Sequence, residues 1–167
     1  MRTVAKRGQR QTSYPPFGNC PPKRVKLVLQ GQGQGENALR EVEAEPEPEK
    51  WARLRALTII FYTLGRRDES DHALDEFTRN FASDAAYQIA ETHAVRGELD
   101  VAFEWLEKAR TQRDPGLATV LAEPTLAPLH ADPRWTAFLA KMGLADRARM
   151  FRNPFAPRSA VTKSKSG

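Results

Sequence analysis

The stretch RGELDVAFEWLEKA, residues 96–109, brings four carboxylates close to the aromatic rings of Phe103 and Trp105. Carboxylates held beside an aromatic wall are one arrangement that supports general acid–base catalysis. The same stretch also fits the packing face of a helix, because its apolar residues recur every three or four positions: Val101, Ala102, Trp105, Leu106 and Ala109. Glu104 and Lys108 then lie one turn apart on the solvent side, where opposite charges support a helix. We favour the helix and predict that the protein is not an enzyme.

Histidine, cysteine and serine add no further catalytic arrangement. His93 could serve as a general base, because histidine is the usual residue for that role near neutral pH. It falls on a packing position of a predicted helix, however, without a Ser or Cys nucleophile at a motif spacing. Cys20 is the only cysteine, so an internal disulfide is excluded. His72, His93 and His130 are too scattered to form a metal-ligand motif. We therefore predict no catalytic, cofactor-binding or metal-binding residues.

The glycine run GQGQG follows RVKLVL, which could form a short strand, and precedes a stretch that could form a helix. This order is the one found in a dinucleotide-binding unit, whose glycines stand at the first, third and sixth positions. Here the glycines are Gly31, Gly33 and Gly35, and Glu36 takes the sixth position. No second strand with a ribose-binding acid follows. The run is therefore interpreted as a flexible linker, which EAEPEPEK continues to residue 50.

Charge is distributed unevenly along the 167 residues, whose net charge is +5. Residues 1–30 carry seven Lys and Arg and no acid, and residues 141–167 carry seven basic residues and one acid. Such basic ends attract nucleic acid or anionic surfaces without reading bases, or they only keep the chain soluble. No apolar run reaches the roughly 18 residues that a membrane helix needs, and no signal-peptide stretch follows the N-terminus. We therefore expect a cytoplasmic protein that does not enter a membrane.

Helical periodicity starts in KWARLRALTIIFYTLG, where large apolar residues recur every three or four positions up to a glycine that ends the helix. Three more helices are predicted, over residues 66–82, 83–97 and 98–114. Prolines break the next stretch into short helical turns, and a closing helix begins with Asp132 as its cap and Pro133 in its first turn. The predicted organisation is a helical domain between two disordered segments: residues 46–146, with 1–45 and 147–167 on either side.

Gly65 and Gly97 are 32 residues apart, and each ends one helix before a short turn into the next. This spacing is close to the 34-residue period of the tetratricopeptide repeat. The second hairpin carries small and large residues at the places this repeat requires: Ile89, Ala90, Gly97, Ala102, Leu106 and Ala109. The first hairpin is more degenerate, with Thr58 where a small residue is expected. The chain resembles a tetratricopeptide repeat protein, which implies an all-α solenoid of two hairpins and a C-terminal capping helix.

About half of the chain, from Leu64 to Leu144, also resembles the C-terminal end of tetratricopeptide regions in bacterial signalling proteins. The turn QRDPGL and the final helix DPRWTAFLAKMGL carry this resemblance. Those proteins join the repeats to an adenylate or guanylate cyclase, a winged-helix DNA-binding domain or a protein kinase. Residues 1–45 resemble none of these domains, so we do not expect their activities here. An alternative is that the chain is a remnant of such a larger regulator.

Proteins of the tetratricopeptide family bind partner proteins or peptides on the concave face that the first helix of each hairpin forms. By motif position, the residues of this face that we expect to contact a partner are Arg55, Tyr62, Tyr87 and Glu91. The resemblance therefore implies an interaction scaffold, within bacterial signalling or regulation. Binding of nucleic acid or an anionic surface by the basic ends is the alternative.

The first predicted helix is apolar nearly all round, and two hairpins are fewer than the three repeats that usually bury a continuous core. In a longer solenoid a preceding repeat would cover its outer face. We expect a second copy of the chain, or another protein, to cover this face through Trp51, Leu54 and Ile59.

Overall fold

The computed structural model describes residues 35–44 and 50–150, and these residues form helices and turns without any strand. The all-α fold class is therefore confirmed. In chain order the elements are α2 (Gly35–Ala44), α3 (Lys50–Thr63), α4 (Arg67–Phe81), α5 (Ala86–Val95), α6 (Leu99–Gln112), the 3₁₀ helices η1 (Pro115–Thr119) and η2 (Pro124–Leu129), α7 (Pro133–Lys141) and α8 (Ala145–Met150). None of these helices has the length and apolar content that crossing a membrane requires.

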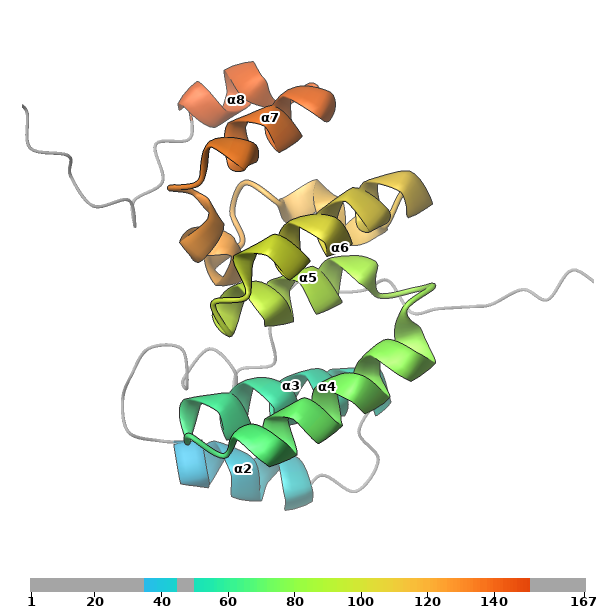
Figure 1. The fold of residues 1–167 in the computed structure, drawn as a ribbon, viewed down its shortest axis with the longest axis vertical. Helices are drawn as coiled ribbons and strands as arrows, with labels where there is room; N and C mark the ends of the chain where they lie inside the picture. The colour runs from blue at the N-terminus through green and yellow to red at the C-terminus, as the bar shows by residue number, and fades with distance from the viewer. Residues whose placement is uncertain (1–34, 45–49, 151–167) are drawn as a thin grey trace, which may run out of the picture.

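Two antiparallel hairpins, α3–α4 and α5–α6, form the body of the molecule (Figure 1). Each turns at a glycine in the left-handed region, Gly65 at a φ of 75° and Gly97 at a φ of 78°. The same hydrogen bond closes both turns: Arg66 N–H donates to the Phe61 carbonyl at 2.9 Å, and Glu98 N–H donates to the His93 carbonyl at 3.0 Å. The glycine spacing thus predicts both hairpins correctly, because only glycine adopts this backbone conformation at little cost.

Close packing within each hairpin follows from small residues at the helix contact. Ala90 and Ala102 are fully buried between α5 and α6. In the first hairpin Thr58 takes the equivalent place, and its hydroxyl is satisfied by donating to the Leu54 carbonyl at 2.8 Å. The Ser70 hydroxyl on α4 donates to the Thr58 carbonyl at 2.8 Å, so a polar contact replaces apolar packing there. The first hairpin therefore accommodates its degenerate position without leaving a buried hydroxyl unpaired.

The prediction that residues 31–45 are a linker is wrong, because ten of these residues form helix α2. Gly35–Ala44 is helical and buries one stripe of apolar residues against α3, namely Ala38, Leu39 and Val42. Ala38, Leu39 and Val42 fall on one helical face by their spacing, and burial of that face holds the short helix in place. The predicted disorder of residues 1–34 and 151–167 lies outside the described residues, and the helical part extends past residue 146 into α8.

The segment after α6 forms the short helical turns that its prolines predict, and each turn has an acidic cap. Asp114 accepts a hydrogen bond from Gly116 N–H at 2.8 Å at the start of η1. Glu123 accepts from Thr125 N–H at 3.1 Å at the start of η2. Asp132 accepts from Arg134 N–H at 2.9 Å at the start of α7, as predicted. These side chains satisfy N–H groups that a helix start otherwise leaves unpaired.

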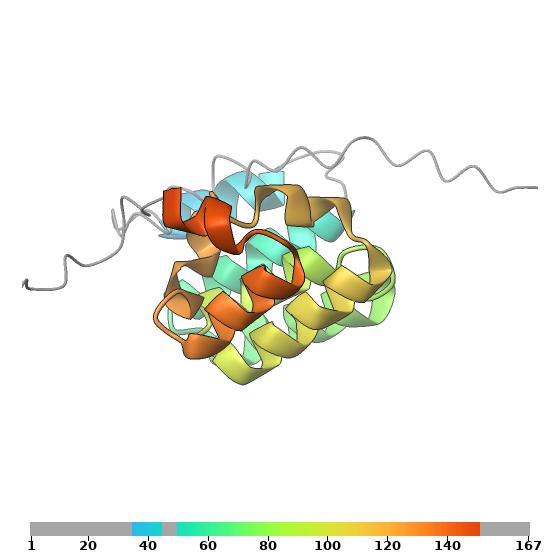
Figure 2. The same cartoon turned by 90° about the horizontal axis from the view of Figure 1, so that it is seen from above.

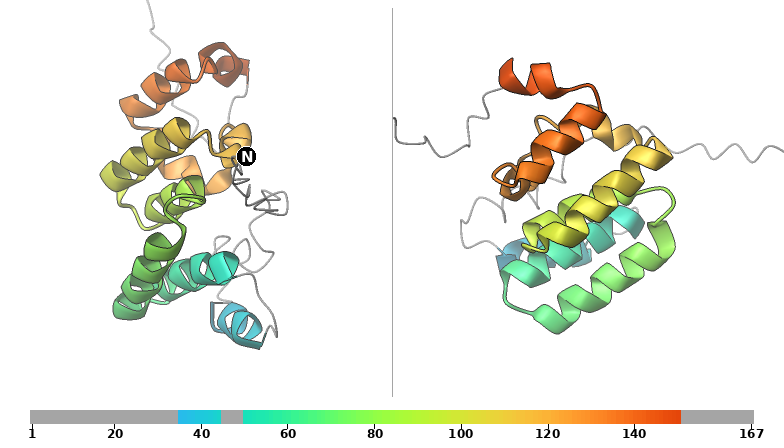
Figure 3. Two further views of the ribbon diagram at one scale, coloured as in Figure 1. Left: turned by 90° about the vertical axis from the view of Figure 1, so that its right-hand side faces the viewer. Right: turned by 45° about the horizontal axis from the view of Figure 1, so that its top comes forward.

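Helices α2 to α6 and the two 3₁₀ helices form three layers, which the side view separates, and α7 and α8 follow beyond α6 (Figure 3, left). Helices α4 and α6 form the outer layer, and α3 and α5 form the middle layer. On the other side of the middle layer lie α2, packed on α3, and η1 and η2, packed on α5, as the view from above also shows (Figure 2). We call α2, η1 and η2 together the covering layer, and the surface of α3 and α5 beneath it the inner face.

Candidate functional site

The predicted partner-binding residues lie mostly in the core. Arg55 on α3 and Glu91 on α5 form an ion pair, with 2.8 Å between Nη2 and Oε2, and only 4% of each side chain is exposed. Tyr87 is fully buried on α5. The prediction that these three residues form an open concave face is therefore wrong. Their side chains do come together, but they do so beneath the covering layer.

The buried Arg55–Glu91 pair joins the first hairpin to the second. Burial raises the pKa of Glu91 to about 7, because the cost of removing its charge from water outweighs the attraction of Arg55. The carboxylates of Glu123 and Asp114 add a smaller repulsion in the same direction. A carboxylate that titrates near neutral pH is often functional, but this one has no access to solvent, so its role is to connect the two hairpins.

A glycine explains why the covering layer approaches the inner face so closely. A Cβ atom at Gly116 in η1 would lie 2.4 Å from Cδ1 of the Tyr87 ring, so only glycine fits there. Asp114, which precedes η1, also accepts a hydrogen bond from Tyr87 N–H at 3.0 Å. The apolar side chains that complete the contact are Leu117, Val120, Leu126 and Leu129. The chain itself thus occupies the surface on which a repeat protein would hold a peptide.

Tyr62, the fourth predicted contact residue, is half-buried at the junction of the hairpins. Its hydroxyl donates to the Arg96 carbonyl at 2.5 Å, and the Arg67 guanidinium lies over its ring at 3.9 Å. Arg96 in turn donates to the Ser70 hydroxyl at 2.5 Å and pairs with Asp71. Tyr62 therefore belongs to a network that fixes the turn of the second hairpin against α3 and α4.

The residues predicted for self-association are also covered within one chain. Ile59 is fully buried, beneath α2, and Leu54 packs in the cluster around Phe77. Trp51 is half-buried against that same cluster. Helix α2 covers Ile59, so Ile59 offers no surface for self-association. Leu54 is mostly covered by the cluster around Phe77 and keeps only a 7% exposed surface.

In the opening stretch, residues 99–109 are helical and Gly97 forms the turn, as predicted. Ala102, Leu106 and Ala109 are fully buried, whereas Val101 is 37% exposed. Its carboxylates do more than face solvent, however, because two of them pair with α7. Asp100 pairs with Arg134 at 2.7 Å, and Glu107 pairs with Lys141 at 2.5 Å. His93 is 9% exposed and lies 2.6 Å from Glu98, in keeping with a packing position.

Between these two ion pairs lies an open groove of about 760 Å³. Its walls come from α6 and α7, and the residues that line it are Asp100, Phe103, Glu104, Glu107, Arg134, Ala137, Phe138 and Lys141. The Arg134 guanidinium lies over the Phe103 ring at 4.5 Å from its centroid. We call this the α6–α7 groove. Sequence reasoning missed it, because it depends on the distance between two helices separated by about twenty residues of irregular chain.

No family model matches this chain, and neither a curated protein nor a solved structure is significantly similar to it. Within residues 35–44 and 50–150, no three or more His, Cys, Asp or Glu side chains gather in a way that could hold a metal ion. Among the described surfaces, the α6–α7 groove combines an open volume with aromatic and charged side chains.

Proposed function

We propose that this protein is a non-enzymatic interaction module of the tetratricopeptide type, and that it binds a partner protein in bacterial signalling or regulation. The repeat assignment is supported by the two hairpins, whose turn glycines are 32 residues apart. The binding surface is not the concave face but the α6–α7 groove. The observation that carries this proposal is an open groove between two surface ion pairs, with Arg134 of one pair over the largely buried ring of Phe103.

The composition of the α6–α7 groove suits a protein partner. Aromatic and arginine side chains are enriched among the residues that contribute most to protein–protein affinity, and Phe103, Phe138 and Arg134 supply them here. The side chains of Arg134 and Lys141 are about half exposed, at 47% and 56%. Exposed ion pairs of this kind contribute little to stability, so Lys141 can exchange Glu107 for a carboxylate on a partner. Arg134 can exchange Asp100 in the same way while it keeps its second pair, with Asp132 at 2.7 Å.

The partner expected from this chemistry is a segment with one or two large apolar side chains between charged residues. The apolar groups would lie against Phe103 and Phe138, and an acidic residue would pair with Arg134 or Lys141. The groove volume of about 760 Å³ lies within the usual range for sites that hold a few side chains.

The test blocks the groove without touching the core. Ala137 is exposed on α7 and lines the groove, so Ala137→Arg fills the space with a side chain that favours helix. Ala140→Arg is the matched control, because Ala140 lies on the same helix and does not line the groove. Full-length chains carrying each change would be compared in affinity capture from the source bacterium, followed by titration with the purified partner.

Loss of the partner with Ala137→Arg and its retention with Ala140→Arg is the expected outcome, with at least a tenfold weaker Kd for the first variant, equivalent to about 1.4 kcal/mol. Equal affinity of both variants and the unchanged chain would contradict the groove assignment. Failure of the unchanged chain to retain any protein would contradict the proposed function itself.

A second function, nucleic-acid binding, is favoured by the charge distribution. The described residues contain 15 basic and 18 acidic residues, so the excess positive charge lies in the remaining segments, above all in residues 1–30. Binding through those segments would fall steeply with salt and would not depend on base sequence. Titration of duplex DNA at two salt concentrations, with the full chain and a chain lacking residues 1–30, separates this function from the first.

A further inference from the structure

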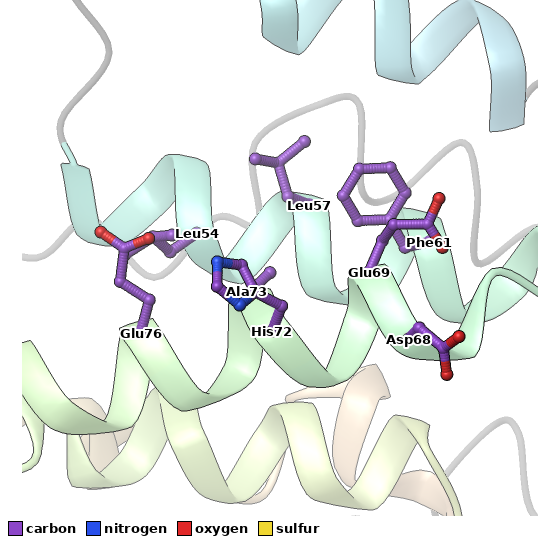
Figure 4. A pocket seen from close by; sticks show the side chains of 8 residues that line it. All are labelled: Leu54, Leu57, Phe61, Asp68, Glu69, His72, Ala73 and Glu76. Atoms are coloured by element: carbon purple, nitrogen blue, oxygen red, sulfur yellow. The ribbon is translucent and has the colours of Figure 1, made fainter.

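A second open groove lies on the first hairpin, between α3 and α4, with a volume of about 380 Å³. Figure 4 shows the side chains that line it: Leu54, Leu57, Phe61, Asp68, Glu69, His72, Ala73 and Glu76. Leu54, Leu57, Phe61 and Ala73 make the groove apolar inside. Asp68, Glu69, His72 and Glu76 all come from α4 and stand along one rim. We call this the α3–α4 groove.

The rim of the α3–α4 groove is acidic. Helix α4 contains five acidic and two basic residues. Among the described residues the Asp68 carboxylate has no ion pair. Glu69 pairs with Arg66 at 2.8 Å and Glu76 pairs with Lys50 at 3.0 Å, and all four side chains are at least 36% exposed. Such exposed pairs exchange partners readily, so the groove suits a segment that combines apolar and cationic side chains.

The chain contains such a segment just before α2. Residues 23–29, KRVKLVL, carry three cations and no acid, and apolar residues alternate through them. If the segment bound in an extended form, alternate side chains would point to opposite sides. Val25, Leu27 and Leu29 would then share one side with Lys23, and Arg24 and Lys26 would lie on the other.

Residues 23–29 are close enough in the chain to reach the groove. Gly35, where α2 begins, lies against Leu64, since a Cβ atom there would be 2.6 Å from Leu64 Cδ2. Leu64 comes three residues after Phe61, which lines one end of the groove. The six residues from Leu29 to Gly35 can span about 20 Å when extended. The linker is thus long enough to place the segment along the groove, and it includes two further glycines.

We propose that residues 23–29 of the same chain bind in the α3–α4 groove, with Val25, Leu27 and Leu29 on the apolar residues and the cations along the acidic rim. A tether of this length gives an effective concentration in the millimolar range, so a weak intrinsic contact is sufficient. Release of the segment would expose an apolar groove on the first hairpin, while the α6–α7 groove on the second stays unchanged.

The natural cysteine offers a direct test on the full chain. Cys20 is the only cysteine and lies three residues before Lys23, so a nitroxide spin label there reports where the segment sits. In a ¹⁵N-labelled chain we expect the label to broaden the amide signals of Leu57, Phe61 and His72 selectively. Two further samples, Leu27→Asp and Asp68→Lys, should each remove the broadening, because one removes an apolar contact and the other reverses the free charge of the rim.

Two controls distinguish binding in the groove of the same chain from a general charge effect and from binding between chains. Asp75→Lys makes the same charge change on an exposed residue of α4 that does not line the groove, and it should leave the broadening intact. A mixture of spin-labelled ¹⁴N chain with unlabelled ¹⁵N chain should show none. Broadening in that mixture would mean that the groove holds a second copy, and would overturn the proposal. Three other results would also overturn the proposal: uniform broadening, broadening centred on another surface, or broadening that persists in Asp68→Lys.

Discussion

The first hairpin, α3–α4, and the second, α5–α6, turn alike but are covered differently. On the first, α2 lies across one part of α3, and no described residue covers the α3–α4 groove. On the second, η1 and η2 cover α5, and every residue from Ala86 to Ala94 is less than 10% exposed. The repeat pattern therefore determines each hairpin and its turn. The segments between and around the hairpins determine how much of each hairpin is covered.

The largest loss of stability should come from leaving the buried Glu91 carboxylate without its cation. Arg55→Met leaves Glu91 buried without its cation, which should lower the free energy of unfolding by about 3 kcal/mol or more above pH 8. The loss should be smaller at pH 6, because Glu91 is then protonated in the folded state of both proteins.

The unchanged protein should itself lose stability as the pH rises from about 4.5 to 7, because over this range the folded state holds a proton that the unfolded state has released. Urea unfolding of both proteins at pH 6 and pH 9 measures the first trend, and unfolding of the unchanged protein at pH 4.5 and pH 7 measures the second.

Arg66→Met is the matched control for this prediction, because Arg66 and its partner Glu69 are both exposed. It should leave the free energy of unfolding unchanged at either pH. If Arg55→Met also left the free energy of unfolding unchanged at pH 9, the Arg55–Glu91 pair would be no more buried than the Arg66–Glu69 pair. That result would contradict the closed inner face.

Apolar packing should show a similar contrast between the hairpins. Leu106 is fully buried in the cluster that α5, α6 and α7 share, so Leu106→Ala should lower the free energy of unfolding by about 3 kcal/mol. Leu57 is half-buried at the open groove of the first hairpin, so Leu57→Ala should cost only about 1 kcal/mol. Thermal unfolding distinguishes these values, since 1 kcal/mol shifts the Tm of a domain of this size by about 5 °C. Equal losses would show that both hairpins are covered to the same extent.

The close contact of η1 with Tyr87 predicts an intermediate effect. Gly116→Ala places a methyl group 2.4 Å from the ring, and the resulting overpacking should cost about 2 kcal/mol. Ala118 is exposed on the same 3₁₀ helix, so Ala118→Ser should change little. A neutral Gly116→Ala variant in urea unfolding would mean that η1 does not lie on the inner face.

The smallest loss of stability should come from replacing the turn glycines, and it should be the same in the two hairpins. Gly65 and Gly97 both have positive φ angles, and a Cβ atom at either would meet nothing within 4 Å. Each change to alanine should therefore cost about 1 kcal/mol from backbone strain alone. A loss several times larger at one of them in thermal unfolding would show that the two turns are not equivalent.

The sequence predicts the local features of this fold better than its long-range ones. Gly65 and Gly97 identify both turns, and Asp132 and Pro133 identify the start of α7, because turns and caps depend on residues a few positions apart. The prediction of a linker over α2 is wrong, although Ala38, Leu39 and Val42 show a helical stripe. The surrounding glycines and prolines conceal that signal.

The candidate site shows the limit more clearly. The sequence pattern places Arg55 and Glu91 on matching faces of two predicted helices, and their opposite charges 36 residues apart are the signal that they pair. What the motif does not show is that residues 115–130 fold back over them. In that contact, apolar residues such as Leu117 and Leu126 pack on α5, about thirty residues earlier in the chain. These residues show no helical periodicity in the sequence, so the pattern does not predict the contact.

The covering of the inner face can be measured most directly by its access to a thiol reagent. Ala94 is fully buried on α5 and Val101 is 37% exposed on α6, so each is replaced by cysteine in a chain that also carries Cys20→Ser. If residues 115–130 close the inner face, the thiol at position 94 should react at least about 100-fold more slowly than the thiol at position 101, since it must wait for local opening. Equal rates at the two positions would show that the inner face is open, and would contradict the closed arrangement of α5 beneath η1 and η2.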